Sequence, residues 1–231
     1  MFSPHSVLVQ SAMQLPLFDP PDDSAAQPAA AFAALDEARA AALDCTRCGL
    51  ARTRQRVVFG AGAAPARLFV LGEGPSEADD ASGAPFSGPS GRVLDAWLRT
   101  LDTSRAAVWV SNVVRCRAAE LFGQHPRNRP PRPSEIKACR YWLDIELAFV
   151  APEVVLCLGA TPGRVLLGRG FKLDRDRGRW ATGPGGILVL PTYNPAYLLR
   201  LRSQQRAAAE AAVATDLALV RACLAPADTP P

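Results

Sequence analysis

Short apolar runs alternate with longer amphipathic stretches along most of this chain. Four runs have the length and composition of buried strands, and they span residues 67–72, 107–114, 153–158 and 186–191. Apolar residues at helical spacing predict helices over residues 31–43, 91–101, 133–150, 161–167 and 203–224. Strands separated by helices indicate an α/β fold, here a three-layer α/β/α sandwich with a central four-stranded, mostly parallel sheet.

In a fold of this class, ligands bind outside the carboxyl ends of the parallel strands. The informative loops are therefore those that follow Leu71, Asn112, Leu158 and Pro191. The first of these loops contains Gly72-Glu73-Gly74-Pro75. Its glycines would let backbone N–H groups approach a substrate or a water molecule closely.

Composition divides the chain into one domain and two terminal segments. Residues 1–32 are rich in Pro, Ala, Ser and Asp without periodicity, which is typical of a disordered tail, and residues 226–231 form a flexible end. Residues 33–225 remain as one domain, in a chain of 231 residues that is 48% hydrophobic. The chain has no apolar run of about 18 residues and no signal-peptide pattern, so we expect a cytoplasmic protein with no membrane span.

The charge is distributed unevenly. The chain has a formal net charge of +4, yet residues 1–40 carry five acidic residues against Arg39, a net of −4. The remainder therefore carries +8, almost all of it arginine. A basic body suits a polyanionic ligand, although an arginine preference imposed by genome composition would produce the same pattern.

Four of the six cysteines fall into two pairs. Cys45 and Cys48 have Cys-x-x-Cys spacing, and Cys116 and Cys139 flank a proline-rich loop. In a cytoplasmic chain this usage favours metal ligation over disulfides, and four thiolates suit either a structural zinc ion or an iron–sulfur cluster. A redox Cys-x-x-Cys is the alternative for the first pair, but no strand precedes it.

A series of short motifs runs through residues 45 to about 202. They are Cys45-x-x-Cys48-x-Leu50, Gly72-Glu73-Gly74-Pro75, Gly83-x-Pro85-Phe86-x-Gly88, Asn112-Val113-Val114-Arg115-Cys116-Arg117, Asn128-Arg129-x-Pro131-x-Pro133-x-Glu135-Ile136-x-x-Cys139, Leu158-Gly159, and Tyr193-Asn194-Pro195-Ala196-Tyr197-Leu198-Leu199-Arg200. Each motif is weak alone, but together and in this order they are specific. On these motifs the chain resembles the family 4 uracil-DNA glycosylases, iron–sulfur members of the uracil-DNA glycosylase superfamily.

The resemblance implies a uracil-DNA glycosylase-like fold and a DNA repair enzyme that hydrolyses the N-glycosidic bond of uracil. It also implies a structural [4Fe–4S] cluster, with the ligands Cys45, Cys48, Cys116 and Cys139. Within the glycine-rich loop, it assigns Glu73 and Gly74 to the motif that positions the attacking water.

The residue types at the matched positions suit this chemistry. An enzyme that acts on a base in DNA must turn the nucleotide out into a pocket. Phe86, in a tight loop with Pro85 and Gly88, would supply a flat stacking surface, and the amide of Asn112 would complement an acceptor and the N–H donor of uracil. The alternatives are that Phe86 is an ordinary core residue and that Asn112 forms a turn.

Bond cleavage places positive charge on the sugar and negative charge on the departing base. Carboxylates near the sugar and hydrogen-bond donors near the base would stabilise these charges. Asp79, with Asp80 as its neighbour, is a candidate for the sugar side; the alternative, equally favoured, is that both are solvated loop acids. Family members usually have histidine where this chain has Asn194. Loss of such a donor typically costs about 3 kcal/mol, so we expect slow excision; a catalytically inactive damaged-DNA binder or a glycosylase for another deaminated base are the alternatives.

Two further segments are expected to contact DNA. Arg200 and Arg202, after Leu198-Leu199, fit a wedge loop that places apolar residues in the duplex and cations near phosphates. The alternative is an ordinary helix start. Arg129, after an unusually long loop, would contact phosphates. A related branch uses a histidine in a basic insertion to capture DNA covalently, but that basic run is absent here and His125 is expected to be a solvated loop residue.

The tail carries one motif of its own. Gln14-Leu15-Pro16-Leu17-Phe18 resembles the short peptide that binds the bacterial sliding clamp, and a disordered segment is a suitable context for it. The alternative is an unused hydrophobic patch. We expect a monomer that acts on uracil-containing DNA, associated with the bacterial nucleoid.

Overall fold

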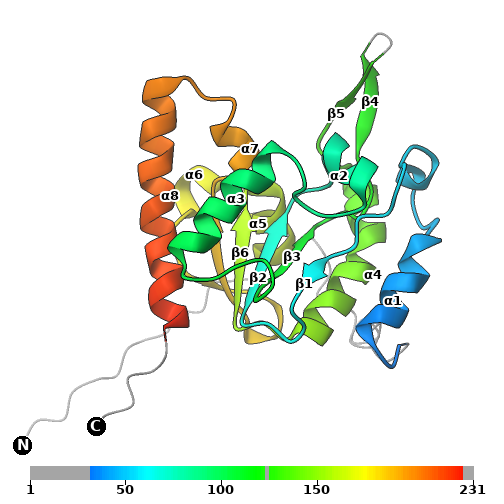
Figure 1. Ribbon diagram of the computed structural model, residues 1–231, viewed down its shortest axis with the longest axis horizontal. Coiled ribbons are helices and arrows are strands. Elements are labelled where there is room, and N and C mark those ends of the chain that lie inside the picture. The colour runs from blue at the N-terminus through cyan, green and yellow to red at the C-terminus, as the bar shows by residue number, and fades with distance from the viewer. Residues whose placement is uncertain (1–31, 123–124, 226–231) are drawn as a thin grey trace, which may run out of the picture.

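The computed structural model describes residues 32–122 and 125–225 (Figure 1). The predicted clamp-binding peptide Gln14–Phe18, almost all of the predicted tail and the C-terminal segment lie outside the described residues. The described part contains the whole of the predicted domain except residues 123 and 124.

The centre of the molecule is a six-stranded sheet with the order β1-β3-β2-β6-β8-β7. The strands are β1 (Ala61–Gly62), β2 (Leu68–Gly72), β3 (Trp109–Asn112), β6 (Val154–Leu158), β7 (Ala181–Thr182) and β8 (Leu188–Thr192). The four inner strands are parallel and correspond to the four predicted strands, while β1 and β7 add two-residue antiparallel edges. A strand of only two residues carries no periodic signal, so these two edge strands could not be predicted.

Helices surround the sheet. They are α1 (Leu35–Leu43), α2 (Glu77–Ser82), α3 (Pro89–Thr100), α4 (Pro133–Val150), α5 (Ala160–Leu167), α6 (Leu173–Asp176), α7 (Pro195–Leu198) and α8 (Ser203–Leu224), with 3₁₀ turns at Gly49–Arg52 and Pro184–Gly186. Proline occupies the first position of α3 and of α4, where its missing N–H leaves no hydrogen bond unmade. None of the described helices has the length and apolar character needed to cross a membrane.

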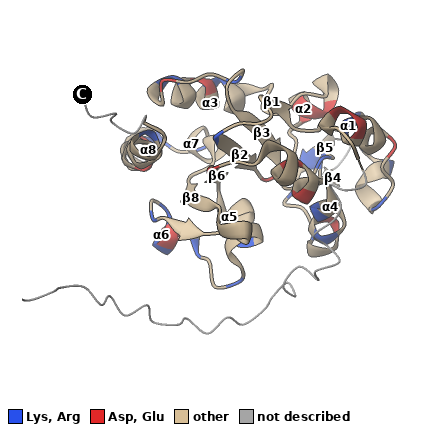
Figure 2. Ribbon diagram, turned by 90° about the horizontal axis from the view of Figure 1, so that it is seen from below, with Lys and Arg blue, Asp and Glu red and all other residues tan. Residues whose placement is uncertain are grey.

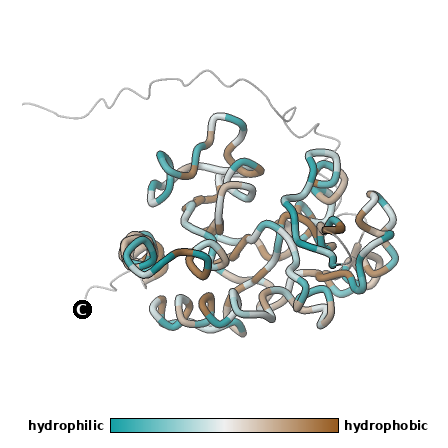
Figure 3. Tube along the Cα trace, turned by 90° about the horizontal axis from the view of Figure 1, so that it is seen from above, coloured by the Kyte–Doolittle hydropathy of each residue, from teal (hydrophilic) through white to brown (hydrophobic). Residues whose placement is uncertain are grey.

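Two hydrophobic cores lie on opposite faces of the sheet. Within β2, Phe69 and Leu71 belong to the core shared with α1, α4 and α5, whereas Leu68 and Val70 belong to the core shared with α3, α7 and α8. Views along the strands show helices on both sides of the sheet (Figures 2 and 3). Because both faces are covered, the inner strands are continuous apolar runs, and the predicted three-layer α/β/α sandwich is confirmed.

A hairpin stands apart from the main sheet. Strands β4 (Ala119–Phe122) and β5 (His125–Asn128) pair in antiparallel register, with Phe122 opposite His125. Figure 1 shows the hairpin extending beyond the ends of the central strands, next to α2. The segment that the sequence predicted as an extended loop is therefore an ordered β-ribbon over most of its length.

Candidate active site at the carboxyl edge of the sheet

The strand order places a ligand-binding position between β2 and β6. The chain passes from β2 to β3 on one side and then crosses to β6 on the other, so the order of the parallel strands reverses at β2 and β6. Loops that leave such a point diverge and open a crevice outside the strand ends. The glycine-rich loop after β2 lies at this position, as predicted.

Gly72, Asn112 and Phe86 meet at the ends of β2 and β3. Gly72 and Asn112 are register partners. A Cβ atom on Gly72 would lie 2.4 Å from Oδ1 of Asn112 and 2.7 Å from Cζ of Phe86. The two side chains that the sequence proposed for base binding therefore both lie against the backbone of Gly72, and only glycine at position 72 allows this close approach.

The amide of Asn112 has an unused donor. Its side chain is only 2% exposed, and its Nδ2 has no hydrogen-bond partner among the described residues. Buried side-chain donors are nearly always paired, because an unpaired one loses about 1–3 kcal/mol of hydration without compensation. An acceptor on a bound ligand would satisfy this group, which agrees with a role for Asn112 in binding rather than in a turn.

Phe86 is held in an unfavourable backbone conformation. Its φ is 55°, in the left-handed region that residues with a side chain seldom adopt. Next to it, the Ser87 backbone N–H and hydroxyl donate to Oδ1 of Asp79 at 2.7 and 2.9 Å, and the Ser76 N–H donates to the other oxygen at 2.9 Å. The surrounding hydrogen bonds thus fix the loop that presents the aromatic ring.

This arrangement corrects the role predicted for Asp79. The side chain caps α2 and binds the Phe86 loop, and the residue is 5% exposed, so both oxygens are occupied by the protein's own donors. Asp80 is 1% exposed and accepts hydrogen bonds from the backbone N–H groups of Gln55 and Arg56. Neither acid is a solvated loop residue, and Asp79 positions the base-binding loop instead of facing a sugar.

Arg105 is a second support for this loop. Its guanidinium donates to the carbonyl oxygens of Pro85 and Phe86 at 2.9 and 2.8 Å, and it pairs with Asp95 at 2.5 Å. Sequence reasoning missed Arg105, since it lies far from every recognised motif and its partners are backbone atoms.

Glu73 and Gly74 occupy the crevice itself. The Glu73 carboxylate accepts a hydrogen bond from the Thr161 hydroxyl, at the start of α5 on the far side of the reversal point. A Cβ on Gly74 would lie 2.9 Å from Cγ2 of Val114, so this turn also requires glycine. The carboxylate is half-buried and fixed in place, which suits a group that orients a small molecule.

Asn194 lies at the tips of β6 and β8. It caps α7: Oδ1 accepts from the Ala196 N–H at 2.8 Å, while Nδ2 donates to the Leu158 carbonyl at 3.1 Å. A Cβ on Gly159 would be 3.3 Å from the Asn194 Cβ. The amide is anchored to the strand ends, and only its second Nδ2 hydrogen is left to serve a substrate.

The four predicted metal ligands line one cavity. Cys45, Cys48, Cys116 and Cys139 all contribute to it. Three N–H groups donate to the thiols: Trp142 Nε1 to Cys45 at 3.2 Å, the backbone N of Arg115 to Cys139 at 3.3 Å, and Arg54 Nη1 to Cys116 at 3.6 Å. Burial raises the pKa of the Cys116 thiol to about 12, and the charge of Arg54 opposes that shift.

The uracil DNA glycosylase superfamily model matches residues 59–218, a span that contains the whole central sheet. The chain belongs to this superfamily. A type-4 uracil-DNA glycosylase of Thermotoga maritima is 38% identical over 162 residues, covering 70% of this chain and 81% of the relative. Type-4 uracil-DNA glycosylases of Sulfurisphaera tokodaii and Archaeoglobus fulgidus are 31% and 32% identical, covering 71% of this chain and 76% and 83% of the relatives.

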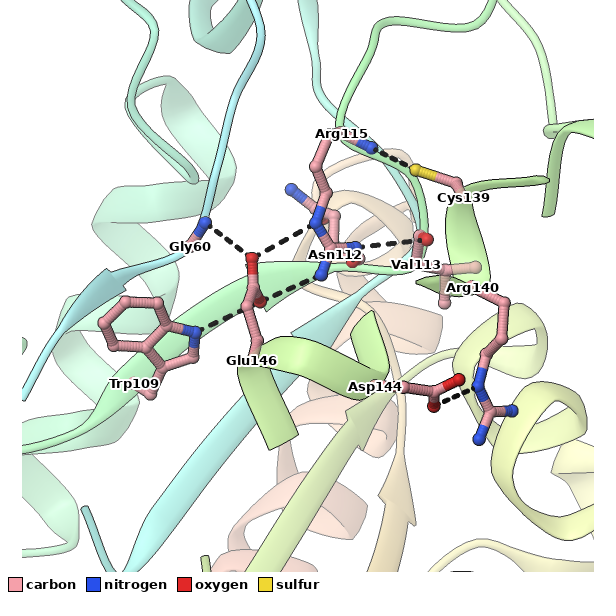
Figure 4. A network of polar contacts seen from close by, with 9 residues as sticks. All are labelled: Gly60, Trp109, Asn112, Val113, Arg115, Cys139, Arg140, Asp144 and Glu146. Atoms are coloured by element: carbon pink, nitrogen blue, oxygen red, sulfur yellow. Dashed lines mark hydrogen bonds and ion pairs between the residues drawn. The ribbon is translucent and has the colours of Figure 1, made fainter. Parts of the chain in front are cut away.

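In this superfamily member, a buried ion pair connects the cysteine cavity with the end of β3 that carries Asn112. Arg115 is 1% exposed and pairs with Glu146, which is fully buried, at 2.9 Å. Glu146 also accepts from the Gly60 N–H at 3.0 Å and from Trp109 Nε1 at 3.2 Å. Arg115 in turn donates to the Asn112 carbonyl, so the strand end carrying Asn112 is tied to the segment that carries Cys116 and, through the Arg115 N–H, to Cys139 on α4 (Figure 4).

Two of the residues predicted to contact DNA make contacts inside the protein instead. Leu198 is 1% exposed and packs in the core formed with α3 and α8, whereas its neighbours Tyr197 and Leu199 are each 40% exposed. An apolar wedge at this loop would therefore be Leu199, because α7 turns Leu198 inward. Arg200 is exposed, as predicted.

Arg129 is likewise not available to DNA. Its guanidinium binds both carboxylate oxygens of Glu135 at 2.6 and 2.8 Å, and its side chain is 13% exposed. The hydrogen bond from Arg129 holds the pKa of the Glu135 carboxyl below its usual value. Arg129 thus secures the base of the hairpin to α4.

Proposed function

We propose that this protein is a uracil-DNA glycosylase that hydrolyses the bond between uracil and deoxyribose during base excision repair. The observation that carries the proposal is the buried, unpartnered Nδ2 of Asn112 beside the Phe86 ring. The hydrogen-bonding edge of uracil presents acceptor, N–H donor and acceptor. The Asn112 amide pairs with one acceptor and the donor together, while Phe86 stacks on the base.

The remaining crevice residues fit the cleavage step. As the bond breaks, the sugar gains positive charge and the base gains negative charge. The Asn112 donor stabilises the base, and Glu73, fixed by Thr161, orients the attacking water together with the backbone of Gly74. The free Nδ2 hydrogen of Asn194 assists departure of the base.

Excision is slow by comparison with an enzyme that has histidine at position 194. Asn194 cannot become cationic, and its amide already caps α7 and binds the Leu158 carbonyl. The loss of one strong donor corresponds to a rate decrease of about 10²–10³. Asn194 at this position therefore predicts slow excision, not a complete loss of excision.

The test is excision by the purified protein on single-stranded and mismatched oligonucleotides that contain uracil, hypoxanthine or xanthine. The proposal predicts release of uracil above background from at least the single-stranded substrate. Release of only hypoxanthine or xanthine would identify a glycosylase for another deaminated base. Tight binding with no release of any base would identify an inactive damaged-DNA binder.

We also propose that Cys45, Cys48, Cys116 and Cys139 hold a [4Fe–4S] cluster with a structural role. The four thiols surround one cavity and receive N–H donors, as expected for cluster sulfurs. Across residues 32–122 and 125–225, no three His, Cys, Asp or Glu side chains converge as they would around one ion. Four thiolates suit either zinc or a cluster, and the similarity to the type-4 uracil-DNA glycosylases favours the cluster.

The cluster would hold the segment that contains Cys116 and Arg115 against α4. Through Arg115, it would also hold the end of β3 in place. The measurement is the visible spectrum and metal content of anaerobically purified protein. We expect a brown protein that contains iron and acid-labile sulfide. A colourless protein with stoichiometric zinc would contradict the cluster.

A finer proposal concerns a protein partner. The peptide Gln14–Phe18 binds the sliding clamp, which would bring a monomeric enzyme to replicating DNA in the bacterial nucleoid. The full chain should co-purify with a bacterial clamp, and replacing Leu17 and Phe18 by alanine should abolish binding without changing uracil excision. Clamp binding that persists in the double variant would refute the assignment.

A further inference from the structure

The tip of the β4–β5 hairpin exposes two large apolar side chains. Leu121 is 77% exposed and Phe122 is 63% exposed, the two highest values among the exposed large hydrophobic residues of the described chain. A short edge ribbon with adjacent exposed Leu and Phe is unfavourable in water unless another molecule covers it.

A cation accompanies the aromatic ring. The guanidinium of Arg127, on the facing strand, lies 4.1 Å from the centre of the Phe122 ring. This contact orders the ring from one side, while most of its surface stays open to solvent. An aromatic ring beside an arginine is the combination that single-stranded nucleic-acid sites use, where the ring stacks on a base and the cation meets a phosphate.

The base of the hairpin is held by hydrogen bonds from Arg117 and contacts α2. Arg117 is 6% exposed; its Nε donates to Oδ1 of Asn128 at 2.7 Å and its Nη2 donates to the Pro126 carbonyl at 3.2 Å. The same guanidinium pairs with Glu77 at 3.5 Å, at the first residue of α2. Because α2 begins only four positions after Glu73, this ion pair places the base of the hairpin near the crevice.

The position and charge of the hairpin select DNA as its partner. It extends from the rim that carries Gly72 and Asn112, beyond the carboxyl ends of the strands (Figure 1). Glu120 on the hairpin and Glu77 at its base are exposed carboxylates, and Arg127 and Arg132 are exposed cations on and beside the hairpin. A protein partner that covers only an apolar tip would not require these cations.

We propose that Phe122, supported by Arg127 and flanked by Leu121, stacks on a base that neighbours the turned-out nucleotide. This inference rests on the proposed function, since it assumes that DNA lies over the crevice. The hairpin then acts as a second reading element for unpaired DNA, at a distance from the pocket formed by Phe86 and Asn112.

The test measures affinity for a single-stranded oligonucleotide that contains one 2′-fluoro-2′-deoxyuridine, which resists cleavage. Phe122→Ala removes one base–aromatic stack, so we expect its Kd to be roughly 5- to 150-fold higher than that of the wild type. Phe122→Trp should keep the affinity, and its added fluorescence should be quenched when DNA binds. Trp180→Ala is the matched control, because Trp180 is an aromatic residue that is 37% exposed beside the edge strand β7.

The outcomes separate this inference from the proposed function. Wild-type excision of uracil together with an unchanged Kd for Phe122→Ala would overturn the hairpin and leave the glycosylase in place. Equal losses in Phe122→Ala and Trp180→Ala would also overturn it, and so would a self-association that Phe122→Ala abolishes while DNA affinity stays constant. If the wild type releases no uracil, the glycosylase fails, and the Kd series still decides whether the hairpin binds DNA.

Discussion

Replacing Glu146 by glutamine should destabilise the protein strongly, although residue 146 touches no substrate. The substitution keeps the size of the side chain and removes its charge. Arg115 would then remain as a cation that is 1% exposed and lacks its counter-ion. Gly60 and Trp109 would also compete for the one carbonyl oxygen that glutamine retains.

The magnitude follows from the burial of both partners. Removing one member of a buried ion pair costs about 3–5 kcal/mol, because the other charge is left uncompensated. The hydrogen bonds from Arg115 to the Asn112 and Val113 carbonyls survive the substitution, so we expect the lower end, about 3 kcal/mol. For a domain of this size, that is a large share of a total stability of about 5–15 kcal/mol.

The assay is urea unfolding of the purified, metal-loaded protein, followed by far-ultraviolet circular dichroism. Glu210→Gln is the matched control, because Glu210 pairs with Arg206 on the surface of α8, where both side chains are more than 40% exposed. That control should lose no more than about 0.5 kcal/mol. A loss below about 1 kcal/mol for Glu146→Gln would refute the view that this pair secures the end of β3.

Three other substitutions test separate parts of the site. Gly72→Ala should lower kcat/KM for uracil excision at least 100-fold with little change in fold, since the new Cβ would lie 2.4 Å from Oδ1 of Asn112; near-normal kinetics would contradict a pocket at this point. Asn194→His should raise kcat for uracil excision by about 10-fold or more, and an equal or lower kcat would show that the missing donor is not limiting. Glu135 has a lowered pKa through its hydrogen bond to Arg129, so its stabilising effect is present above the usual Glu pKa of about 4.3 and is lost as pH falls. The free energies of unfolding of wild type and Glu135→Gln should therefore differ at pH 7, and the difference should shrink as pH falls below the usual Glu pKa and through the lowered one; a constant difference would argue against this ion pair.

The parallel sheet was predictable because its strands are covered on both faces. Each inner strand is a short unbroken apolar run, and the long helices α4 and α8 have the predicted bounds of Pro133–Val150 and Ser203–Leu224. The hairpin was not predictable, since Ala119–Phe122 and His125–Asn128 contain a proline and several charged residues and have no apolar face. Its pairing depends on tertiary anchors such as Arg117.

The site was predictable where a residue type is required by local geometry. Gly72 and Phe86 could be placed because a strand exit and a tight loop define them. Asp79 was misassigned because an acidic residue after such a loop can face either substrate or the loop itself, and only the structure shows its bonds to Ser87. Leu198 lies in the core and Leu199 is exposed, a difference the sequence could not give because the short helix α7 has no periodic signal that tells the inward leucine from the outward one.

The central claim is that Asn112 reads uracil in a slot closed by Phe86, and the direct measurement is single-turnover release of uracil from a single-stranded oligonucleotide. We predict that Asn112→Ala slows release at least 100-fold, while Gln204→Ala, which removes an exposed amide on α8, leaves the rate unchanged. Release at the wild-type rate by Asn112→Ala, with its fold intact, would contradict the account.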